Sequence, residues 1–210
     1  MTENLESARQ AAIKVAGSDD RFDHVSIALH WLTVLLIVMQ FSTAWLRENV
    51  DHNSSFATTL LGAHRNSGVL IWIAGIFRLV WRHNFAYLPP FPAGMPKLQQ
   101  TVAKANEYGL YVLLLVLPIT GLGRVLFRGQ PFDLLFWHVP ALFAENDSIR
   151  HLLVEAHEIG AEALLALIGL HAGAALFHRL VLRDGVLQRM LPRISERTKL
   201  TPTLAKGDVE

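Results

Sequence analysis

Residues 152–182, LLVEAHEIGAEALLALIGLHAGAALFHRLVL, decide the fold of this chain. A bilayer core needs about 20 residues of helix to cross it, and this largely apolar run is longer. Because lipid offers the backbone no hydrogen-bond partners, such a segment folds as a helix. His157 and His171 are fourteen residues apart, which places them on nearly the same side of a helix, roughly 21 Å apart along its axis. His178 follows on the same stripe, so the stretch predicts a membrane helix with histidines along one side.

Three further apolar segments precede this one. They occupy residues 25–46, 64–82 and 108–127. We therefore predict an all-α fold, an integral membrane four-helix bundle over residues 25–182, between a polar tail at 1–24 and a basic tail at 183–210. We expect Pro118 to kink the third helix without ending it, because neighbouring helices can satisfy the freed carbonyl. The segments 64–82 and 152–182 carry polar residues at one end.

The composition agrees with a membrane protein. Hydrophobic residues make up 51% of the chain, charged residues only 18%, and the mean hydropathy is +0.30. This much apolar surface excludes disorder for the body of the chain. A net charge of +1 with scattered basic residues argues against a nucleic-acid partner. The chain has no cysteine, which excludes disulfides, thiolate-held iron–sulfur clusters and covalent c-type haem.

The lysines and arginines predict the topology. With the first tail inside, fourteen of them fall on the inside and five on the outside. The positive-inside rule then places both termini in the cytoplasm. We find no cleavable signal peptide in the first 24 residues.

The histidines are the candidate functional residues. By depth, His64 matches His157 and His30 matches His171, so that one pair lies in each leaflet. Polar groups in hydrocarbon are functional by default, and haem with two axial histidines fits each pair in size and ligand type. Satisfied polar residues in a bundle are one alternative. A second is a divalent-metal site at His157, which has three carboxylates nearby: Glu155, Glu158 and Glu162. Four more histidines, His52, His83, His138 and His151, fall in loops or at their edges.

Other polar residues lie close to the predicted pairs. Arg65 and Arg78 could neutralise haem propionates, although a headgroup contact explains Arg78 equally well. His178 and Arg179 lie at the inner end of the fourth helix, where a histidine could bind quinone or deliver a proton. A plain interfacial pair is the alternative. Gly169 and Gly173 around His171 form a small-residue pattern typical of close helix packing.

Several motifs in this order and spacing resemble the prokaryotic cytochrome b561 family over about residues 21–193. They are Ala-Leu-His30-Trp31, Ala-His64-Arg-Asn-Ser-Gly68, Tyr111 to Pro118-Ile-Thr-Gly121, Ala-His157-Glu158, Gly-Leu-His171-Ala-Gly-Ala-Ala, Phe-His178-Arg179 and Arg189-Met-Leu-Pro192-Arg193. The resemblance implies a four-helix cytochrome of a bacterial inner membrane with two haem b groups. Carried onto this chain, His64 and His157 would ligate the outer haem, and His30 and His171 the inner one.

The best understood type in the family implies superoxide oxidation coupled to ubiquinone reduction. Its relatives often carry histidines near the start of the third helix, whereas this chain has Lys104-Ala-Asn-Glu107-Tyr108 there. Lys104 could attract an anion, whereas an unpaired Glu107 would repel one. The expected partners are membrane lipid, quinone, and superoxide or another small electron donor.

Two other functions remain open from the sequence. The chain could be a non-catalytic di-haem anchor that relays electrons from a partner dehydrogenase or hydrogenase to quinone. It could also be a divalent-metal transporter. A copurifying redox partner protein would favour the anchor, and metal dependence without a visible spectrum would favour the transporter.

Overall fold

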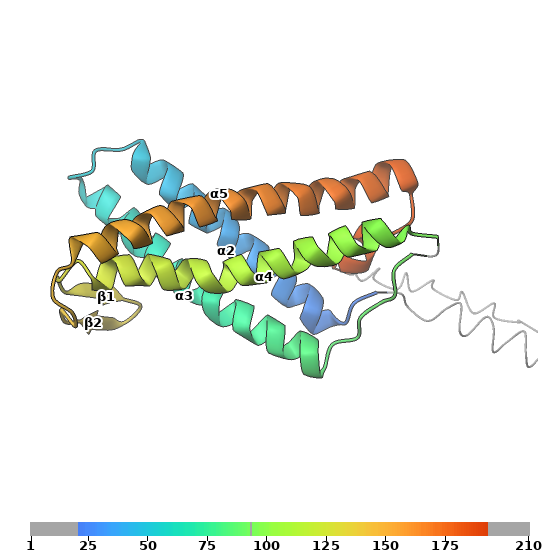
Figure 1. Cartoon of the computed structure of the whole chain (residues 1–210), viewed down its shortest axis with the longest axis horizontal. Helices are drawn as coiled ribbons and strands as arrows, with labels where there is room; N and C mark the ends of the chain where they lie inside the picture. Colours follow the sequence, from blue (N-terminus) through green and yellow to red (C-terminus); the bar gives the residue numbers. More distant parts are fainter. Residues whose placement is uncertain (1–20, 93, 193–210) are drawn as a thin grey trace, which may run out of the picture.

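The protein is described by a computed structural model that covers residues 21–92 and 94–192. Its elements in chain order are α2 (His24–Glu48), α3 (Ser55–Asn84), α4 (Lys97–Leu126), β1 (Phe132–Leu134), β2 (Trp137–Val139), α5 (Asp147–Phe177), the π-helical turn η1 (His178–Leu182) and the 3-10 turn η2 (Leu187–Met190) (Figure 1). β1 and β2 form an antiparallel hairpin in which Asp133 is opposite His138. The predicted helical fold is confirmed, apart from this small hairpin.

All four long helices begin before their predicted apolar segments, and the difference is largest for α3 and α4. α3 starts at Ser55, where the Ser54 side chain caps it by accepting a hydrogen bond from the Ala57 amide at 3.1 Å. α4 starts at Lys97, eleven residues before the predicted start at residue 108. The first turns of both helices are too polar for a hydropathy window, yet helix-forming residues continue both helices past the lipid-facing part, with the Ser54 cap in addition at α3. Pro118 lies inside an unbroken α4, as expected.

Within residues 21–92 and 94–192, three helical segments are long and apolar enough to cross a membrane. They are α2, α4 and the continuous segment Asp147–Leu182, with mean hydropathies of 1.9, 1.9 and 1.7. The helix α3 is long enough but not apolar enough to be counted among them, because polar residues such as His64, Arg65 and Arg78 interrupt its apolar sequence. α3 packs along α2 and also contacts α4, so its polar residues face neighbouring helices. The arrangement is consistent with a helical membrane bundle.

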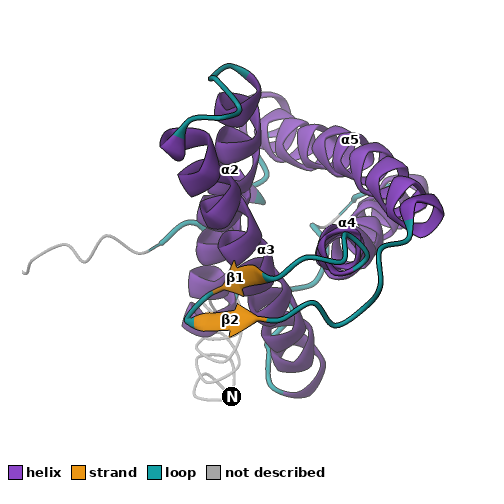
Figure 2. Cartoon of the chain, turned by 90° about the vertical axis from the view of Figure 1, so that its left-hand side faces the viewer, coloured by secondary structure: helices purple, strands orange, loops and turns teal. Residues whose placement is uncertain are grey.

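The helices form two antiparallel pairs, α2 with α3 and α4 with α5, joined mainly through α3 and α4 (Figures 1 and 2). Within the described residues α2 and α5 make hardly any direct backbone contact. We call the end that carries β1 and β2 the hairpin end. The opposite end, where the described chain starts and finishes, is the terminal end.

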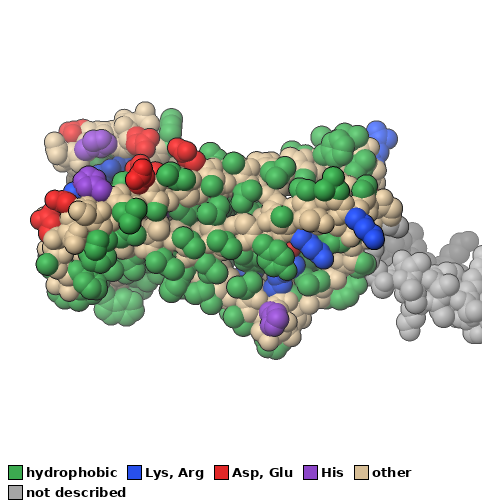
Figure 3. Space-filling model, in the orientation of Figure 1, with side chains coloured by type: hydrophobic (Ala, Val, Ile, Leu, Met, Phe, Trp, Pro, Cys, Tyr) green, Lys and Arg blue, Asp and Glu red, His purple; other side chains and the backbone are tan. Residues whose placement is uncertain are grey.

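The buried core is small, and its central cluster consists of Leu36, Ile71, Ala74 and Leu114. Many large apolar side chains are exposed instead, Leu35 by 65% and Leu165 by 56%. On the face shown in Figure 3, hydrophobic side chains cover the middle of the bundle and charged side chains gather toward its ends. This is the surface expected where lipid replaces water around the helices.

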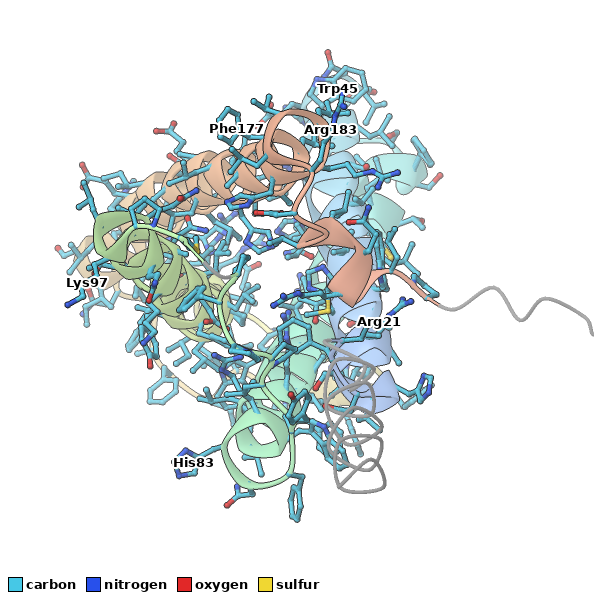
Figure 4. The ribbon with its side chains drawn as sticks, turned by 90° about the vertical axis from the view of Figure 1, so that its right-hand side faces the viewer. Arg21, Trp45, His83, Lys97, Phe177 and Arg183 are labelled. Atoms are coloured by element: carbon cyan, nitrogen blue, oxygen red, sulfur yellow. The ribbon has the colours of Figure 1, made fainter. Side chains whose placement is uncertain are left out.

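The chain after η1 folds back onto the terminal end (Figure 4). The indole nitrogen of Trp31 donates to the Met190 carbonyl at 2.8 Å, and the Arg189 guanidinium donates to the Pro90 carbonyl at 2.6 Å. The segment expected to form a tail from residue 183 therefore has a docked first part, up to residue 192. Residues 1–20 and 193–210, the greater part of both predicted tails, lie outside the described residues.

Candidate haem-binding site

The structure brings together both pairs of histidines that depth had matched. The ring centroids of His64 on α3 and His157 on α5 are 6.3 Å apart. Those of His30 on α2 and His171 on α5 are 6.2 Å apart. A metal–imidazole bond is about 2.0 Å long and the centroid lies about 1.1 Å behind the nitrogen, so two imidazoles on opposite sides of one iron have centroids roughly 6 Å apart. Both spacings fit an axial histidine pair.

The hairpin-end pair, His64 and His157, is held in the orientation of a ligand. His157 Nδ1 lies 3.1 Å from the Leu117 carbonyl, to which it can donate. His64 Nδ1 lies 3.1 Å from the Gln40 carbonyl, and the Gln40 amide nitrogen lies 3.0 Å from His64 Nε2. A donor bond from Nδ1 fixes the tautomer of His157 and leaves its Nε2 available for a metal, whereas a metal at His64 would have to displace the Gln40 amide from Nε2.

A cavity of about 580 Å³ adjoins this pair. All five arginines that sequence analysis placed on the outside line it: Arg47, Arg65, Arg124, Arg128 and Arg150. The Nε atoms of Arg47 and Arg65 are buried without a hydrogen-bond partner in the described part of the chain. Buried donors of this kind need an acceptor, and carboxylates such as haem propionates supply one.

Arg65 also ties the hairpin to α3. Its guanidinium donates to the Asp133 carbonyl at 2.8 Å and lies 5.1 Å from the centroid of the Phe132 ring. The Leu135 amide donates to the Asn66 side chain at 2.9 Å. The hairpin was not predicted, because its strands have three residues each and no residue pattern marks them.

The terminal-end pair, His30 and His171, has a different environment. The Arg78 guanidinium lies 3.2 Å from His30 Nδ1 and 5.5 Å from the centroid of the Tyr111 ring. His171 is exposed in the structure. A Cβ added at Gly169 or Gly173 would meet no described atom within 4 Å. The expected close helix packing at these glycines is therefore not seen, and the small residues leave open space beside His171.

His178 lies in η1 and is buried, with 5% of its surface exposed. Its Nδ1 contacts the Asp184 carboxylate, and its Nε2 lies 2.8 Å from the amide nitrogen of Gln99 on α4. This burial does not fit the alternative of an interfacial, solvent-facing histidine. Arg179 beside it is exposed. Sequence analysis missed Gln99 and Asp184, because neither residue follows a recognisable motif.

The stretch that lacks the relatives' histidines also contains polar contacts. Lys104 is exposed, and its Nζ lies 5.7 Å from the centroid of the Phe91 ring. Glu107 pairs with Arg82 at 2.9 Å, so its negative charge is compensated. Asn106 is buried, and its side-chain oxygen has no hydrogen-bond partner among the described residues.

Four further histidines lie outside the two histidine pairs. His52 lines the hairpin-end cavity, and His138 contacts Asp133 at 2.8 Å on the exposed hairpin. His83 and His151 are exposed residues near helix ends, and His83 points away from the bundle in Figure 4. No group of three or more histidine, cysteine or acidic side chains within residues 21–92 and 94–192 could hold a metal ion. The carboxylates near His157 therefore give a divalent-metal transporter no support in this part of the chain.

Comparison with known proteins finds a matching family model and several relatives. Residues 21–193 match the family model described as prokaryotic cytochrome b561. "Cytochrome b561 homolog 1" of Escherichia coli K12 is 32% identical over 177 residues, which are 83% of this chain and 98% of that protein. "Probable superoxide oxidase CybB" of Yersinia pestis is 27% identical over 82% of this chain and 97% of its own length. "Cytochrome b561 homolog 2" of Escherichia coli K12 is 25% identical over 84% of this chain and 94% of its own.

Proposed function

The chain belongs to the prokaryotic cytochrome b561 family, whose members are b-type haem membrane proteins that carry electrons. From this premise we propose that it holds two haem b groups and transfers electrons between a small donor and quinone. The observation that carries the proposal is the pair of axial-type spacings, 6.3 Å and 6.2 Å, at opposite ends of one bundle. His64 and His157 would hold the haem at the hairpin end, and His30 and His171 the haem at the terminal end.

Bound haem would supply a reversible one-electron iron couple at each end. The chain's own residues would set the ligand tautomers and neutralise the propionates. At the hairpin end the Leu117 carbonyl accepts from His157 Nδ1 and leaves its Nε2 for iron. The Gln40 carbonyl accepts from His64 Nδ1, and iron would displace the Gln40 amide from His64 Nε2. Arg65 would bind propionate there, and Arg78 would do so at the terminal end. The exposed polypeptide around His171 would be covered once the group is bound.

The reaction that we propose is superoxide oxidation coupled to ubiquinone reduction. Two superoxide ions and one quinone, with two protons, give two molecules of dioxygen and one quinol. The five arginines of the hairpin end would attract the superoxide anion, because clustered charge of one sign raises the local concentration of its counter-ion. The name of the Yersinia pestis relative supports this reaction.

The quinone would bind at the terminal end, where His178 is the candidate for hydrogen bonding or proton delivery. Arg179 and Lys104 complete the predicted set, but both are exposed, and Lys104 lies against Phe91. With Glu107 compensated by Arg82, a net positive charge remains on this part of α4. From the distribution of lysine and arginine we propose a bacterial inner-membrane location with both termini in the cytoplasm.

The first experiment is a dithionite-reduced minus oxidised spectrum of the detergent-purified chain, with haem counted per polypeptide as the pyridine haemochrome. We expect two haem b groups and a sharp low-spin α band. Stopped-flow consumption of superoxide with ubiquinone then tests the reaction. A folded chain from haem-replete cells that bound no haem would refute the proposal.

A chain with two haems that left superoxide untouched and copurified with another redox protein would instead be an electron-relaying anchor. The superoxide part of the proposal would then be wrong, while the haem ligands would stand.

A further inference from the structure

His178 is held at both ring nitrogens. Nδ1 contacts the Asp184 carboxylate and Nε2 lies 2.8 Å from the Gln99 amide nitrogen, while only 6% of the histidine side chain is exposed. An ionised carboxylate only accepts hydrogen bonds and an amide nitrogen only donates. The contacts are therefore satisfied by one neutral tautomer, with the proton on Nδ1 and Nε2 as an acceptor.

The backbone after α5 is shaped to bring Asp184 to this histidine. The helix widens into the π turn η1, a form found frequently at functional sites. Arg183 then takes a left-handed conformation with φ of 54°, which is uncommon outside glycine. This reverses the chain so that the carboxylate reaches back six residues, while its Oδ1 accepts from the Val186 amide at 3.2 Å. This uncommon turn thus brings the Asp184 carboxylate into contact with His178.

The carboxylate is suited to remain charged. Burial raises the pKa of Asp184, but the hydrogen bonds from His178 and from the Val186 amide lower it more, so that the net pKa is below its usual value. The carboxyl is accordingly ionised near neutral pH. An ionised group cannot donate to Nδ1, which keeps the proton on the histidine.

A second aspartate–histidine pair in the same chain shows how burial affects the strength of such a contact. On the hairpin, His138 Nδ1 contacts Asp133 at 2.8 Å, but the two side chains are 70% and 85% exposed. Water competes for both partners there, and exposed pairs of this kind contribute little. At His178 and Asp184 the exposures are 6% and 21%, so the protein and not the solvent selects the tautomer.

We propose that Asp184 is the positioning residue of His178, and that Gln99 occupies on Nε2 the place that a quinol hydroxyl takes when it binds. This deepens the function proposed above and rests on it. A quinol hydroxyl can donate to the Nε2 acceptor that Asp184 maintains, in place of the Gln99 amide. Asp184 and Gln99 therefore act on quinol binding in opposite directions.

The first test is nitrogen NMR of the dithionite-reduced, haem-loaded full chain with 15N-labelled histidine, in which the His178 signals are assigned by their loss in His178→Gln. We expect Nδ1 protonated and Nε2 unprotonated in the wild type. Asp184→Asn should mix or reverse the tautomers, because an amide can either donate or accept, and Asp184→Glu should restore the wild-type state. Asp133→Asn, which removes the matching contact at the surface, should leave the His178 signals unchanged.

The second test is the quinol concentration that half-saturates reduction of the oxidised protein, followed at the haem α band. Asp184→Asn should raise it about tenfold, the cost of losing a charge-assisted hydrogen bond that orients the acceptor. Gln99→Ala should lower it severalfold, because Nε2 no longer has an internal partner. A merely structural role for both residues would shift both variants in the same direction.

The proposal is wrong if His178 carries its proton on Nε2 in the wild type, or if Asp184→Asn changes neither the tautomer nor the quinol response. It is also wrong if Gln99→Ala weakens quinol binding. Failure of the proposed function gives another pattern: the wild type would show the expected tautomer and two haems but no reduction by quinol. Asp184 would then keep its positioning role, and the occupant assigned to Nε2 would be refuted.

Discussion

The two histidine pairs share one spacing but differ in how the protein holds them. At the hairpin end both Nδ1 atoms face backbone carbonyls, those of Gln40 and Leu117, and the cavity is already lined by arginines. At the terminal end His30 faces the Arg78 guanidinium, and His171 lies beside open space. At the hairpin end the protein anchors both rings through Nδ1, whereas the terminal-end site would be completed by the group that binds there. The difference teaches that matching the depth of histidines predicts which rings lie together but not how firmly the protein holds each ring.

The helices explain why the two ends differ. His157 packs against α4, where Gly121 leaves just enough room: a Cβ there would lie 3.0 Å from the His157 ring. Leu164 is the last residue of α5 that is buried in the structure, and a Cβ added at Gly169 or Gly173, on either side of His171, would meet no described atom within 4 Å. Packing therefore orients His157, while His171 depends on what binds beside it.

Removing one histidine of a pair is the substitution from which we expect the largest effect. We expect His157→Ala and His171→Ala each to lower the haem content from two to one per chain, and the double variant to bind none. An alanine leaves iron without one axial nitrogen, and second ligands of this kind are not replaced by neighbours. The measurement is the pyridine haemochrome, with the exposed His83→Ala as the control that keeps both haems. A full complement of haem in His157→Ala would show that the pairing is wrong.

Crowding the rigid site is the next test. Gly121→Val would push its side chain into the His157 ring, and overpacking of this kind costs about 1–3 kcal/mol. We expect haem to be lost from the hairpin end first, seen as a lower haem count with the terminal haem retained. Gly62→Val is the matched control, since a Cβ at Gly62 meets no described atom within 4 Å. Equal haem loss in both variants would refute the idea that Gly121 makes room for the ligand.

The sequence predicted the elements that depend on periodicity and hydropathy. The stripe of His157 and His171, the pairing with His64 and His30, and the uninterrupted helix through Pro118 all follow from helix geometry and the absence of water in lipid. The helices and the histidine stripe are local features, whereas the pairing joins distant residues and follows from their depth along helices that cross the same membrane. In the structure the paired ring centroids lie 6.3 Å and 6.2 Å apart. The sequence did not predict the helix starts at Ser55 and Lys97, because polar helix formers, and the Ser54 cap at α3, leave no hydropathy signal.

What the sequence could not predict are contacts between distant residues that share no motif. Asp184 reaches His178 only because η1 widens and Arg183 turns left-handed, and neither event has a residue signature here. The docking of η2 through Trp31 and Met190 joins positions 159 apart in the chain. The basic composition after residue 183 suggested a tail, since composition reports solubility and not the few hydrogen bonds that fix a segment.

Removing an arginine charge beside each histidine pair tests how the two sites differ in their electrostatic surroundings. Arg78→Gln removes the guanidinium that contacts His30, and loss of a nearby positive charge favours the oxidised iron. We expect the midpoint potential of one haem to fall by tens of millivolts, as a Coulomb energy of roughly 1–2 kcal/mol at effective dielectric 20 implies. Arg65→Gln should have a smaller effect, because four other arginines line the same cavity. Redox titration of the α band measures both, and a larger shift for Arg65→Gln would contradict the comparison.

The smallest expected effect is at Asp23, which secures the terminal end. Its carboxylate caps α2 by accepting from the Ser26 amide at 2.9 Å and also accepts from the Trp81 indole of α3 at 3.1 Å. Asp23→Ala should cost about 1 kcal/mol of stability, typical of a lost cap. Asp23→Asn should cost less, since asparagine caps equally well. The measurement is helix loss on heating in detergent, followed by circular dichroism.

The stability that the Asp23 cap contributes should change with pH in a direction that can be measured. Burial raises the pKa of Asp23, but hydrogen bonds from Ser26 and Trp81 lower it more, so that the net pKa is below the usual 3.8. A depressed folded-state pKa contributes stability above pH 3.8 that is lost as pH falls through the lower folded value. The advantage of the wild type over Asp23→Ala should therefore be constant near neutral pH and shrink only in strong acid. Shrinkage already between pH 7 and 5 would mean that some other group, and not this carboxylate, holds the terminal end together.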